Sequence, residues 1–305
     1  MAMSETARAP EVPTAEAPPP RKRIKEMEVM VADVKVETPD TVTLVFFTGN
    51  DRLDYKAGHF LTIDPHQFEA LSRFIDYFED VKGKKEPPRA YSMCSAPQER
   101  YLAVTVKEER YVRGQTKYPP LLSPLLVKRT LRGMRLTITG FTGPYTLPED
   151  VESRTDHLVH VVAGSGAVPN FAILKDALVR FPALHHTFVC SNKTYEDIIF
   201  REELAALERR NPARLRVIHT LTRDPVTPVA QSVWKGRVNP ATLRELIPDP
   251  KAVLVYACGP ANGPFERAAA RAKGEELKPR FLEAVQQALR EVGVPDARVI
   301  RESYG

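Results

Sequence analysis

Cysteine is scarce in this sequence of 305 residues, and its placement excludes the commonest cysteine-based metal centres. The three cysteines, Cys94, Cys190 and Cys258, lie far apart, and no CxxC pair or four-cysteine set occurs. They therefore cannot by themselves build an iron–sulfur cluster or a structural zinc site. A low, odd count also predicts a reducing compartment without a disulfide framework, and we expect a cytoplasmic protein.

Long apolar runs and clustered charge are missing as well. No run of 18 apolar residues occurs, so we expect no membrane-spanning helix. Residues 1–24 are rich in Pro, Ala and Glu, which predicts a disordered tail and not a secretory signal. The net charge of +5 comes from Lys and Arg residues that are spread along the chain. This distribution favours anionic cofactors or an acidic partner over nucleic acid.

Metal-binding and hydrolase patterns are also lacking. His157 and His160 fall three apart on an expected strand and would point to opposite faces, and His185 and His186 form an expected loop pair without acidic or cysteine neighbours. No GxSxG elbow is present. We therefore expect no metal ligands and no serine-hydrolase site.

Short alternating strands dominate residues 25–152. The segments at 27–37, 41–48, 59–64, 90–95, 101–108 and 134–141 alternate apolar and polar residues, with turn residues between them. This pattern is typical of an antiparallel barrel or sandwich. Residues 65–88 interrupt it with Phe68, Leu71, Ile75, Phe78 and Val81 at helical spacing, which predicts an inserted helix. The insertion would cover an open end of the barrel, or alternatively contact a partner or ligand.

The pattern of apolar and polar residues is different over residues 153–305. A nearly continuous apolar run at 157–164 predicts a strand buried on both faces, and helices and further strands alternate after it, ending with a helix that stops at Gly293. This part is expected to be a parallel α/β domain.

Two glycine-containing turns follow apolar strands of that domain. Gly164, Ser165 and Gly166 precede a helix that begins near Pro169, an arrangement that suits a pyrophosphate. The pattern is GxGxxP, so the usual dinucleotide fingerprint is not met, and a turn without a ligand stays an alternative. Cys258, Gly259 and Pro260 end another strand, where ligands of parallel sheets bind. Cys258 could equally be a small buried apolar residue.

The stretch "RAYSMCSAP" begins at Arg89 and carries a cation, an aromatic ring and a hydroxyl on one strand. Arg89 and Tyr91 share one face, while Ala90 and Ser92 share the other. An arginine can bind phosphate and a tyrosine can stack on a flat ring. Alone, the stretch could also be a half-buried edge strand.

In their order along the chain, these motifs resemble the ferredoxin–NADP reductase family of flavoproteins. The resemblance covers residue 25 to the C-terminus and rests on "GHFLTI", "RAYS", "LAVTVK", "GFTGPYTLP", "GSGAVP", "SNKTYEDIIF", "TLTRD" and "YACGP". It implies a six-stranded Greek-key FAD-binding barrel over 25–152 and a parallel α/β NAD(P)H-binding domain over 153–305. Electrons would pass from NAD(P)H through FAD to an acceptor.

The resemblance also assigns residues to the FAD. Arg89 would contact the pyrophosphate, Tyr91 would pack against the isoalloxazine or ribityl group, and Ser92 would lie near flavin N5. Glu302 would relay a proton. The remaining candidates along the flavin are Ala90, Thr105, Lys107, Ser123 and Tyr304, the last of which would stack on the ring.

The nicotinamide cofactor would occupy the second domain. Gly164, Ser165 and Gly166, with Pro169 behind them, would hold its pyrophosphate, and Cys258, Gly259 and Pro260 would pass beside the nicotinamide. The adenosine ribose would meet Ser191, Asn192, Lys193, Thr222 and Arg223. Both of these segments carry cations and hydroxyls but no carboxylate, which favours NADPH over NADH. Alternatively, Lys193 and Arg223 could be solvated surface charges.

The expected activity is that of an FAD-dependent NAD(P)H reductase. Because the cysteines form no cluster, the electrons would leave to a separate protein such as a ferredoxin, a flavodoxin or an oxygenase component. The "KGKK" loop at 82–85 would attract an acidic partner. The alternative is a non-enzymatic subunit that binds flavin or dinucleotide for redox sensing or assembly.

Overall fold

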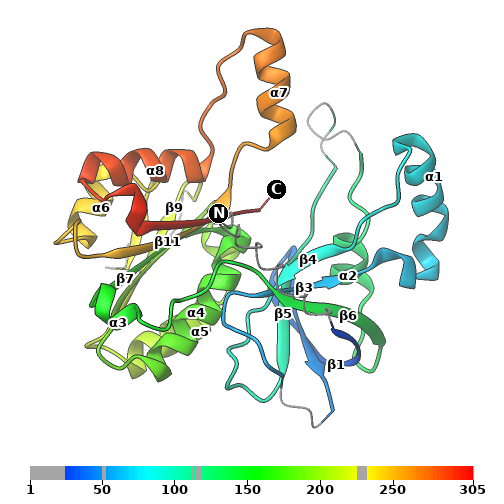
Figure 1. The fold of residues 1–305 in the computed structure, drawn as a ribbon, viewed down its shortest axis with the longest axis horizontal. Coiled ribbons are helices and arrows are strands. Elements are labelled where there is room, and N and C mark those ends of the chain that lie inside the picture. The colour runs from blue at the N-terminus through cyan, green and yellow to red at the C-terminus, as the bar shows by residue number, and fades with distance from the viewer. Residues whose placement is uncertain (1–24, 50–52, 112, 114–117, 225–231, 305) are drawn as a thin grey trace, which may run out of the picture.

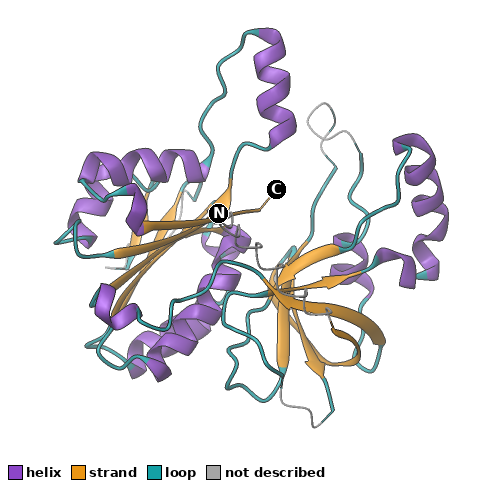
Figure 2. Cartoon of the chain, in the orientation of Figure 1, coloured by secondary structure: helices purple, strands orange, loops and turns teal. Residues whose placement is uncertain are grey.

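The computed structural model describes residues 25–49, 53–111, 113, 118–224 and 232–304. Two six-stranded sheets lie beside each other, one strongly curved, the other covered by helices on both faces (Figures 1 and 2). The N-terminal tail predicted at 1–24 lies outside the described residues. No helix in the described ranges is long and apolar enough to cross a membrane.

The first sheet is antiparallel and has the strand order β4-β3-β6-β1-β2-β5. Its alternating sequences place every second side chain inside: Leu61 and Ile63 on β3 are fully buried, whereas Phe60 and Thr62 are only partly buried. The strands are β1 (Lys25–Thr38), β2 (Thr41–Phe47), β3 (Phe60–Ile63), β4 (Arg89–Ser92), β5 (Leu102–Lys107) and β6 (Arg135–Thr142). The barrel expected from the sequence is confirmed.

The barrel closes at only one point between its two edge strands. An isolated bridge joins Met93 to Val104, and the Cys94 backbone N–H donates to the Ala103 carbonyl at 2.9 Å. On the other side of this bridge, the strands β4 and β5 diverge. The free edge of β4 therefore faces an opening and not another strand.

The insertion between β3 and β4 is helical, as predicted. Two short 3-10 turns (Pro65–Gln67 and Glu69–Leu71) precede α1 (Ser72–Lys82), which ends at Gly83 with φ of +64°. Leu71, Ile75 and Phe78 are buried in the barrel core. Val81, which was expected on the same buried face, is 48% exposed. It lies one turn beyond Phe78, where the helix runs past the end of the barrel (Figure 1).

The second sheet is parallel, with the order β10-β9-β8-β7-β11-β12. Its strands are β7 (His157–Ala163), β8 (His185–Asn192), β9 (Leu215–Leu221), β10 (Val233–Lys235), β11 (Leu254–Pro260) and β12 (Val299–Tyr304). The pair His185 and His186 was expected in a loop, and that prediction is wrong. Both residues begin β8, and the pairing of His185 with His157 extends the sheet.

Helices cover both faces of this sheet, which explains its continuous apolar strands. Leu158 and Val162 on β7 pack with α4, whereas Val159 and Val161 pack with α6 and α8 (Figure 1). Besides α1, the helices are α2 (Ser123–Arg129), α3 (Val151–Arg154), α4 (Ala167–Arg180), α5 (Arg201–Arg210), α6 (Pro240–Leu246), α7 (Pro264–Lys273) and α8 (Phe281–Val292). The predicted parallel α/β class is confirmed.

One hydrophobic cluster runs through the junction of the two sheets. Cys94, Ala103 and Tyr145 from the barrel side pack in the same core as Phe171 and Ile173 of α4. The boundary that we propose between residues 152 and 153 falls inside α3.

Candidate functional site

A cavity of about 560 Å³ opens where β4 and β5 diverge, and both halves of the chain contribute to it. All the residues that the sequence assigned to FAD line it except Glu302, the predicted proton relay, and residues that were not assigned line it as well. The lining consists of Phe78, Lys82, Arg89, Ala90, Tyr91, Ser92, Thr105, Lys107, Glu108, Glu109, Tyr118, Pro119, Pro120, Leu121, Leu122, Ser123, Ser165, Val168 and Tyr304.

The cavity runs along the free edge of β4, so that four consecutive residues reach it. Arg89 through Ser92 all line the wall, although neighbouring side chains on a strand point to opposite faces. A ligand lying along the edge of the strand can touch both faces. Ser92 is 5% exposed, and burial raises the pKa of the Tyr91 hydroxyl, so that it stays neutral.

β5 and α2 form the opposite wall. Lys107 pairs with Asp40 at 2.5 Å, and Thr105 shares a 2.8 Å hydrogen bond with Thr43, so the strand presents both side chains in fixed positions. Ser123 begins α2, and its Oγ accepts a hydrogen bond from the Glu109 backbone N–H at 3.1 Å. The wall therefore combines one cation with two buried hydroxyls.

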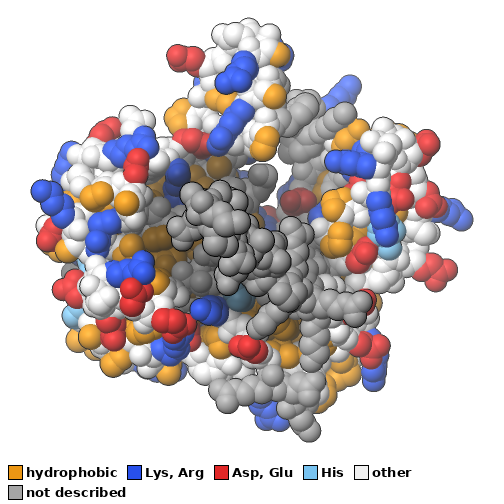
Figure 3. Space-filling view, viewed as in Figure 1, with side chains coloured by type: hydrophobic (Ala, Val, Ile, Leu, Met, Phe, Trp, Pro, Cys, Tyr) orange, Lys and Arg blue, Asp and Glu red, His pale blue; other side chains and the backbone are white. Residues whose placement is uncertain are grey.

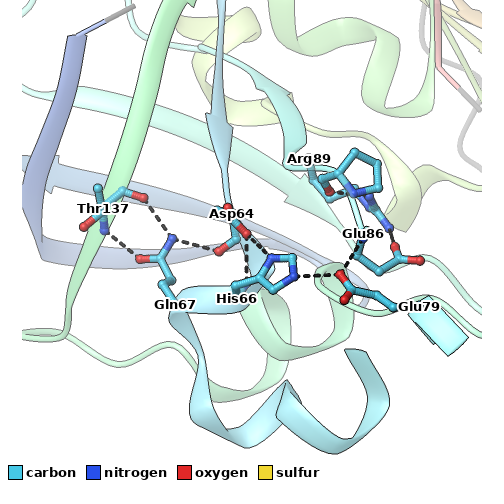
Figure 4. A network of polar contacts seen from close by, with 8 residues as sticks. Asp64, His66, Gln67, Glu79, Glu86, Arg89 and Thr137 are labelled. Carbon is cyan, nitrogen blue, oxygen red and sulfur yellow. Dashed lines mark hydrogen bonds and ion pairs between the residues drawn. The ribbon is translucent and has the colours of Figure 1, made fainter. Parts of the chain in front are cut away.

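Arg89 is held in place by the insertion. Its Nη2 donates to Glu86 Oε2 at 2.5 Å and its Nη1 to the Pro87 carbonyl at 2.5 Å (Figure 4). Glu86 is 2% exposed. A guanidinium fixed by a buried carboxylate loses little conformational entropy when it binds a second anion.

The C-terminal strand brings its side chains to the end of the cavity nearest Ser92. The Tyr304 hydroxyl is hydrogen-bonded to Ser92 Oγ, and Tyr304 lines the cavity. The pKa of Glu302 is raised to about 7, because the effect of burial exceeds the opposing effect of a hydrogen bond with Tyr304. Glu302 Oε2 is buried without a hydrogen-bond partner among the described residues. A carboxyl group of this kind can hold or release a proton near neutral pH.

Cys258 lies behind this end of the cavity and not in its wall. It stands opposite Glu302 in the β11–β12 register, and its side chain is fully buried. Burial, with a smaller contribution from Glu302, raises the thiol pKa well above its ordinary value, so that the thiol is neutral. The predicted place of Cys258 beside the nicotinamide stays a prediction.

In the glycine turn after β7, the backbone packs directly against the backbone at the end of β11. A Cβ atom on Gly166 would lie 2.2 Å from the Cys258 carbonyl oxygen, so only glycine fits there. Gly164 has φ of +53° and no atom within 4 Å of its Cβ position, which leaves the turn open on that side. Ser165 lines the cavity, and Pro169 is buried in the first turn of α4.

The loops after β7, β8 and β11 lie at the same edge of the parallel sheet, because they follow the carboxyl ends of neighbouring strands. Gly259 and Pro260 end β11, where a Cβ atom on Gly259 would lie 2.6 Å from the Phe281 ring. The predicted residues Ser191 and Asn192 end β8 and are largely buried.

The loops after β8 and β9 are linked through their backbones. Thr222 Oγ1 donates to the Asn192 carbonyl at 3.2 Å, and the Arg223 backbone N–H donates to the Lys193 carbonyl at 2.8 Å. The side chains of Lys193 and Arg223 are exposed, and neither forms an ion pair within the described part of the chain. The carboxylate of Asp224 instead accepts from the Tyr195 backbone N–H at 3.0 Å.

The sequence did not identify which residues of the insertion and of the loop before α2 line the cavity. Phe78 and Lys82 of α1, Tyr118, Glu108 and Glu109 line the flavin cavity. The apolar spacing of the insertion predicted that Phe78 is buried, and contact of the insertion with a ligand was the alternative prediction. Among the described residues, no group of three His, Cys, Asp or Glu side chains is placed to bind a metal ion.

The residues present fit an FAD. The cavity has a cationic middle at Arg89 and Lys107, a hydroxyl-rich end at Ser92 and Tyr304, and an open glycine turn at the neighbouring sheet edge. When bound, FAD accepts an electron pair with a proton from a reduced nicotinamide and passes electrons on singly or in pairs. Arg89 and Lys107 would hold the diphosphate, and Ser92 would face the reacting end.

Comparisons with known proteins agree with this geometry. Residues 161–270 match the family described as "Oxidoreductase NAD-binding domain". The Mycobacterium tuberculosis protein named "3-ketosteroid-9-alpha-monooxygenase, ferredoxin reductase component" is 31% identical over 80% of this chain and 60% of its own length. The Rhodococcus rhodochrous protein of the same name is 29% identical over 90% of this chain and 64% of its own length.

Solved structures show the same fold. The FAD/NAD-binding domain of a nitric oxide dioxygenase from Vibrio cholerae superposes with a TM-score of 0.67 at 22% identity, covering 92% of this chain and 98% of that one. The ferredoxin–NADP+ reductase from Plasmodium falciparum superposes with a TM-score of 0.62 at 16% sequence identity. The superposition covers 92% of this chain and 96% of that one. Both structures therefore share the arrangement of a six-stranded antiparallel sheet beside a six-stranded parallel sheet.

The chain is similar to the ferredoxin–NADP reductase family, as the sequence predicted, and the predicted cofactors, FAD and NAD(P)H, are confirmed. It spans between about half and two thirds of the length of the curated relatives that it matches, from 47% to 66%.

The raised pKa of Glu302 predicts a pH-dependent stability of the flavin-free protein. In the folded chain the Glu302 carboxyl keeps its proton up to about pH 7. In the unfolded chain the carboxyl loses its proton near pH 4.5. The free energy of unfolding therefore falls as the pH rises from about 4.5 to about 7. We expect Glu302→Gln to gain stability relative to the parent across that window, with no further gain above it. Urea unfolding at pH 5, 6, 7 and 8 measures this difference, and a difference that is constant with pH would contradict the prediction.

Proposed function

We propose that the chain is a flavin-dependent oxidoreductase that passes electrons from NADPH, or NADH, through FAD to a separate protein. The observation that carries the proposal is the single cavity that gathers Arg89 to Ser92, Lys107 and Ser123 from the barrel with Ser165 and Tyr304 from the other half. A cavity built from both halves suits a reaction between two bound cofactors.

Each residue has a defined part in this proposal. Arg89 and Lys107 neutralise the diphosphate of the flavin and fix its position. Ser92, held by the Tyr304 hydroxyl, donates a hydrogen bond at the reacting end of the ring. Glu302 stores a proton near neutral pH behind Tyr304.

NADPH is the preferred reductant in this proposal. The exposed side chains of Lys193 and Arg223 come from two loops tied by a backbone hydrogen bond, so both cations can approach one 2′-phosphate. The nearest following carboxylate, Asp224, is engaged by the Tyr195 backbone and would not hold a ribose hydroxyl in the manner of NAD sites.

The acceptor is proposed to be a ferredoxin, a flavodoxin or an oxygenase component. The matched relatives named "ferredoxin reductase component" support a partner of this class. The cysteines of this chain are all buried and lie on different strands or loops, so they offer no cluster of their own. The lobe that carries α1 presents Lys and Arg side chains among acidic ones (Figure 3).

An anaerobic titration tests the proposal. The purified protein is loaded with FAD, and NADPH or NADH is added while the flavin absorbance near 450 nm is followed. We expect bleaching by both nucleotides, with NADPH effective at an at least roughly tenfold lower concentration because one phosphate is bound by two cations. A protein that cannot be loaded with FAD would overturn the proposal. A protein that binds FAD but is bleached by neither nucleotide would favour a non-enzymatic flavin-binding subunit.

A further inference from the structure

A second cavity lies at the junction of the two halves and shares no lining residue with the flavin cavity. This junction cavity measures about 520 Å³, a size that suits a small molecule. One wall comes from β1, β2, β5 and the loop before β5, and the other comes from α4, α5 and the residue before α5. In Figure 1, α4 and α5 lie on the side of the parallel sheet that faces β5. A ligand in this cavity would contact both halves at once.

The inner surface of the junction cavity is apolar. Phe171 and Phe200 line it with stacked rings, whose centroids are 4.2 Å apart and whose planes differ by 14°. Val45 from the barrel and Leu207 from α5 also line it, and both are only partly buried. Two stacked rings flanked by accessible aliphatic side chains form a surface that suits a flat apolar group.

The carboxylates in the walls are already engaged by lysines. Lys35 pairs with Glu37 at 3.2 Å and also contacts Glu203, and Lys175 pairs with Glu99 at 2.5 Å. All five residues line the cavity. Each carboxylate therefore has a cationic partner, and the two lysines with three carboxylates leave one negative charge.

Two arginines in the walls have no acidic partner among the described residues. The Arg100 guanidinium lies 5.3 Å from the ring centroid of Tyr101 and has no hydrogen-bond partner in the described ranges. Arg210 donates from Nε to the Ala206 carbonyl at 3.2 Å, which leaves its two terminal nitrogens available. With these two charges, the cavity has an excess of one positive charge. Free guanidinium groups favour a carboxylate, which accepts two parallel hydrogen bonds from one arginine.

The apolar surface is fixed before any ligand binds. Phe200 has a φ of +59°, and it is the one non-glycine residue with a positive φ in the part of the chain that the structure describes. Its backbone N–H donates to Glu37 Oε2 at 3.4 Å across the junction, and Glu37 Oε1 accepts from Thr43 Oγ1 at 2.8 Å. A bulky residue adopts this backbone conformation only where its surroundings hold it, and such residues concentrate at ligand sites. A preformed surface reduces the entropy that a ligand loses by ordering it.

We propose that the junction cavity binds an aromatic carboxylate. Its ring would pack on the apolar surface of Phe171 and Phe200, and its carboxylate would be bound by Arg100 and Arg210. The single negative charge of such a ligand matches the excess of one positive charge in the cavity. The site is separate from the residues proposed for FAD and for the nicotinamide nucleotide, so the inference goes beyond the proposed function and does not depend on it.

Isothermal titration calorimetry with 1-naphthoate tests the inference on the full chain, with FAD present in excess so that the flavin cavity is filled. The neutral isostere 1-naphthamide serves as the second probe. We expect 1-naphthoate to bind the parent at least about tenfold more tightly than 1-naphthamide, because only the carboxylate forms charged hydrogen bonds. In Arg100→Gln/Arg210→Gln the dissociation constant for 1-naphthoate should rise at least about tenfold, and that for 1-naphthamide should change less than about twofold.

Arg209→Gln is the matched control, because Arg209 is exposed on the same helix but does not line the cavity. This variant should bind 1-naphthoate within about twofold of the parent. Both arginines of the double variant are exposed and lack an acidic partner among the described residues, so their loss should leave the fold intact, which circular dichroism and the Tm verify.

Leu207→Gln tests the apolar surface. It should weaken the binding of both probes by at least about threefold, because it replaces accessible apolar surface with an amide. The inference is overturned if the parent fails to bind 1-naphthoate at about 1 mM or prefers it no more than 1-naphthamide. Full affinity for 1-naphthoate in the folded double arginine variant would overturn it as well. A protein that binds 1-naphthoate as expected but cannot be loaded with FAD would contradict the proposed function alone.

Discussion

Replacing Ser92 with alanine should leave FAD bound and slow the reduction of the flavin by NADPH about 10²-fold. The Ser92 hydroxyl is 5% exposed, lines the flavin cavity and is oriented by the hydroxyl of Tyr304. A preoriented donor at the reacting atoms of a water-poor site typically contributes about 10²- to 10³-fold to the rate. Stopped-flow absorbance near 450 nm under anaerobic conditions measures the rate, and the bound flavin is quantified by its absorbance.

Two further variants separate the hydroxyl of Ser92 from its neighbour. Ser92→Thr keeps a hydroxyl and should restore most of the rate. Tyr304→Phe removes the contact to Ser92 but leaves the serine, and we expect an intermediate rate. A Ser92→Ala protein that reduces its flavin within about twofold of the parent rate would show that the hydroxyl has no part in the reaction.

Replacing Arg89 with alanine should mainly weaken FAD binding, by about 10- to 100-fold. Hydrogen bonds to charged groups contribute about 1.5–3 kcal/mol, and Arg89 lines the flavin cavity. Once flavin is supplied at saturation, the rate of its reduction should stay close to that of the parent. The dissociation constant for FAD, measured by fluorescence quenching, gives the result.

The loss of Arg89 also leaves the buried carboxylate of Glu86 with Lys82 alone. The double variant Arg89→Ala/Glu86→Gln removes that charge and serves as the control. If FAD affinity is low in Arg89→Ala but normal in the double variant, Arg89 acts only as a partner for Glu86 and does not bind the cofactor.

Local sequence patterns predicted the fold class of each half. Buried and exposed residues alternate along the strands of the barrel, whereas the strands of the parallel sheet are buried on both faces. The period of two in β3 places Leu61 and Ile63 inside the barrel, and the unbroken apolar run of β7 needs helices on both faces. β12 was missed as a strand, because "VIRESY" is half polar and pairs with β11 only on one edge. The short helices α3 and α6 were also missed, because they carry too few residues for a periodic signal.

The candidate site was predictable in part. The order of motifs assigned Arg89 to Ser92, Ser123 and Tyr304 to a flavin, and the structure brings them into one cavity, although their individual roles stay predictions. The place of Lys82 beside Tyr118 and Arg89 was not predictable from local patterns. That contact depends on how α1 returns to the barrel, which is decided by packing of Phe78 between distant segments.

The hydrophobic cluster that joins Tyr145 of the barrel side to α4 has a consequence for cooperativity. Because Asn170 on α4 also donates to the Tyr145 hydroxyl at 3.0 Å, separating the halves would expose apolar surface and break this buried hydrogen bond. The two halves are therefore coupled energetically, so that they resist moving relative to each other. Substitution of Tyr145 would then weaken both cofactor sites at once, although Tyr145 does not line the flavin cavity.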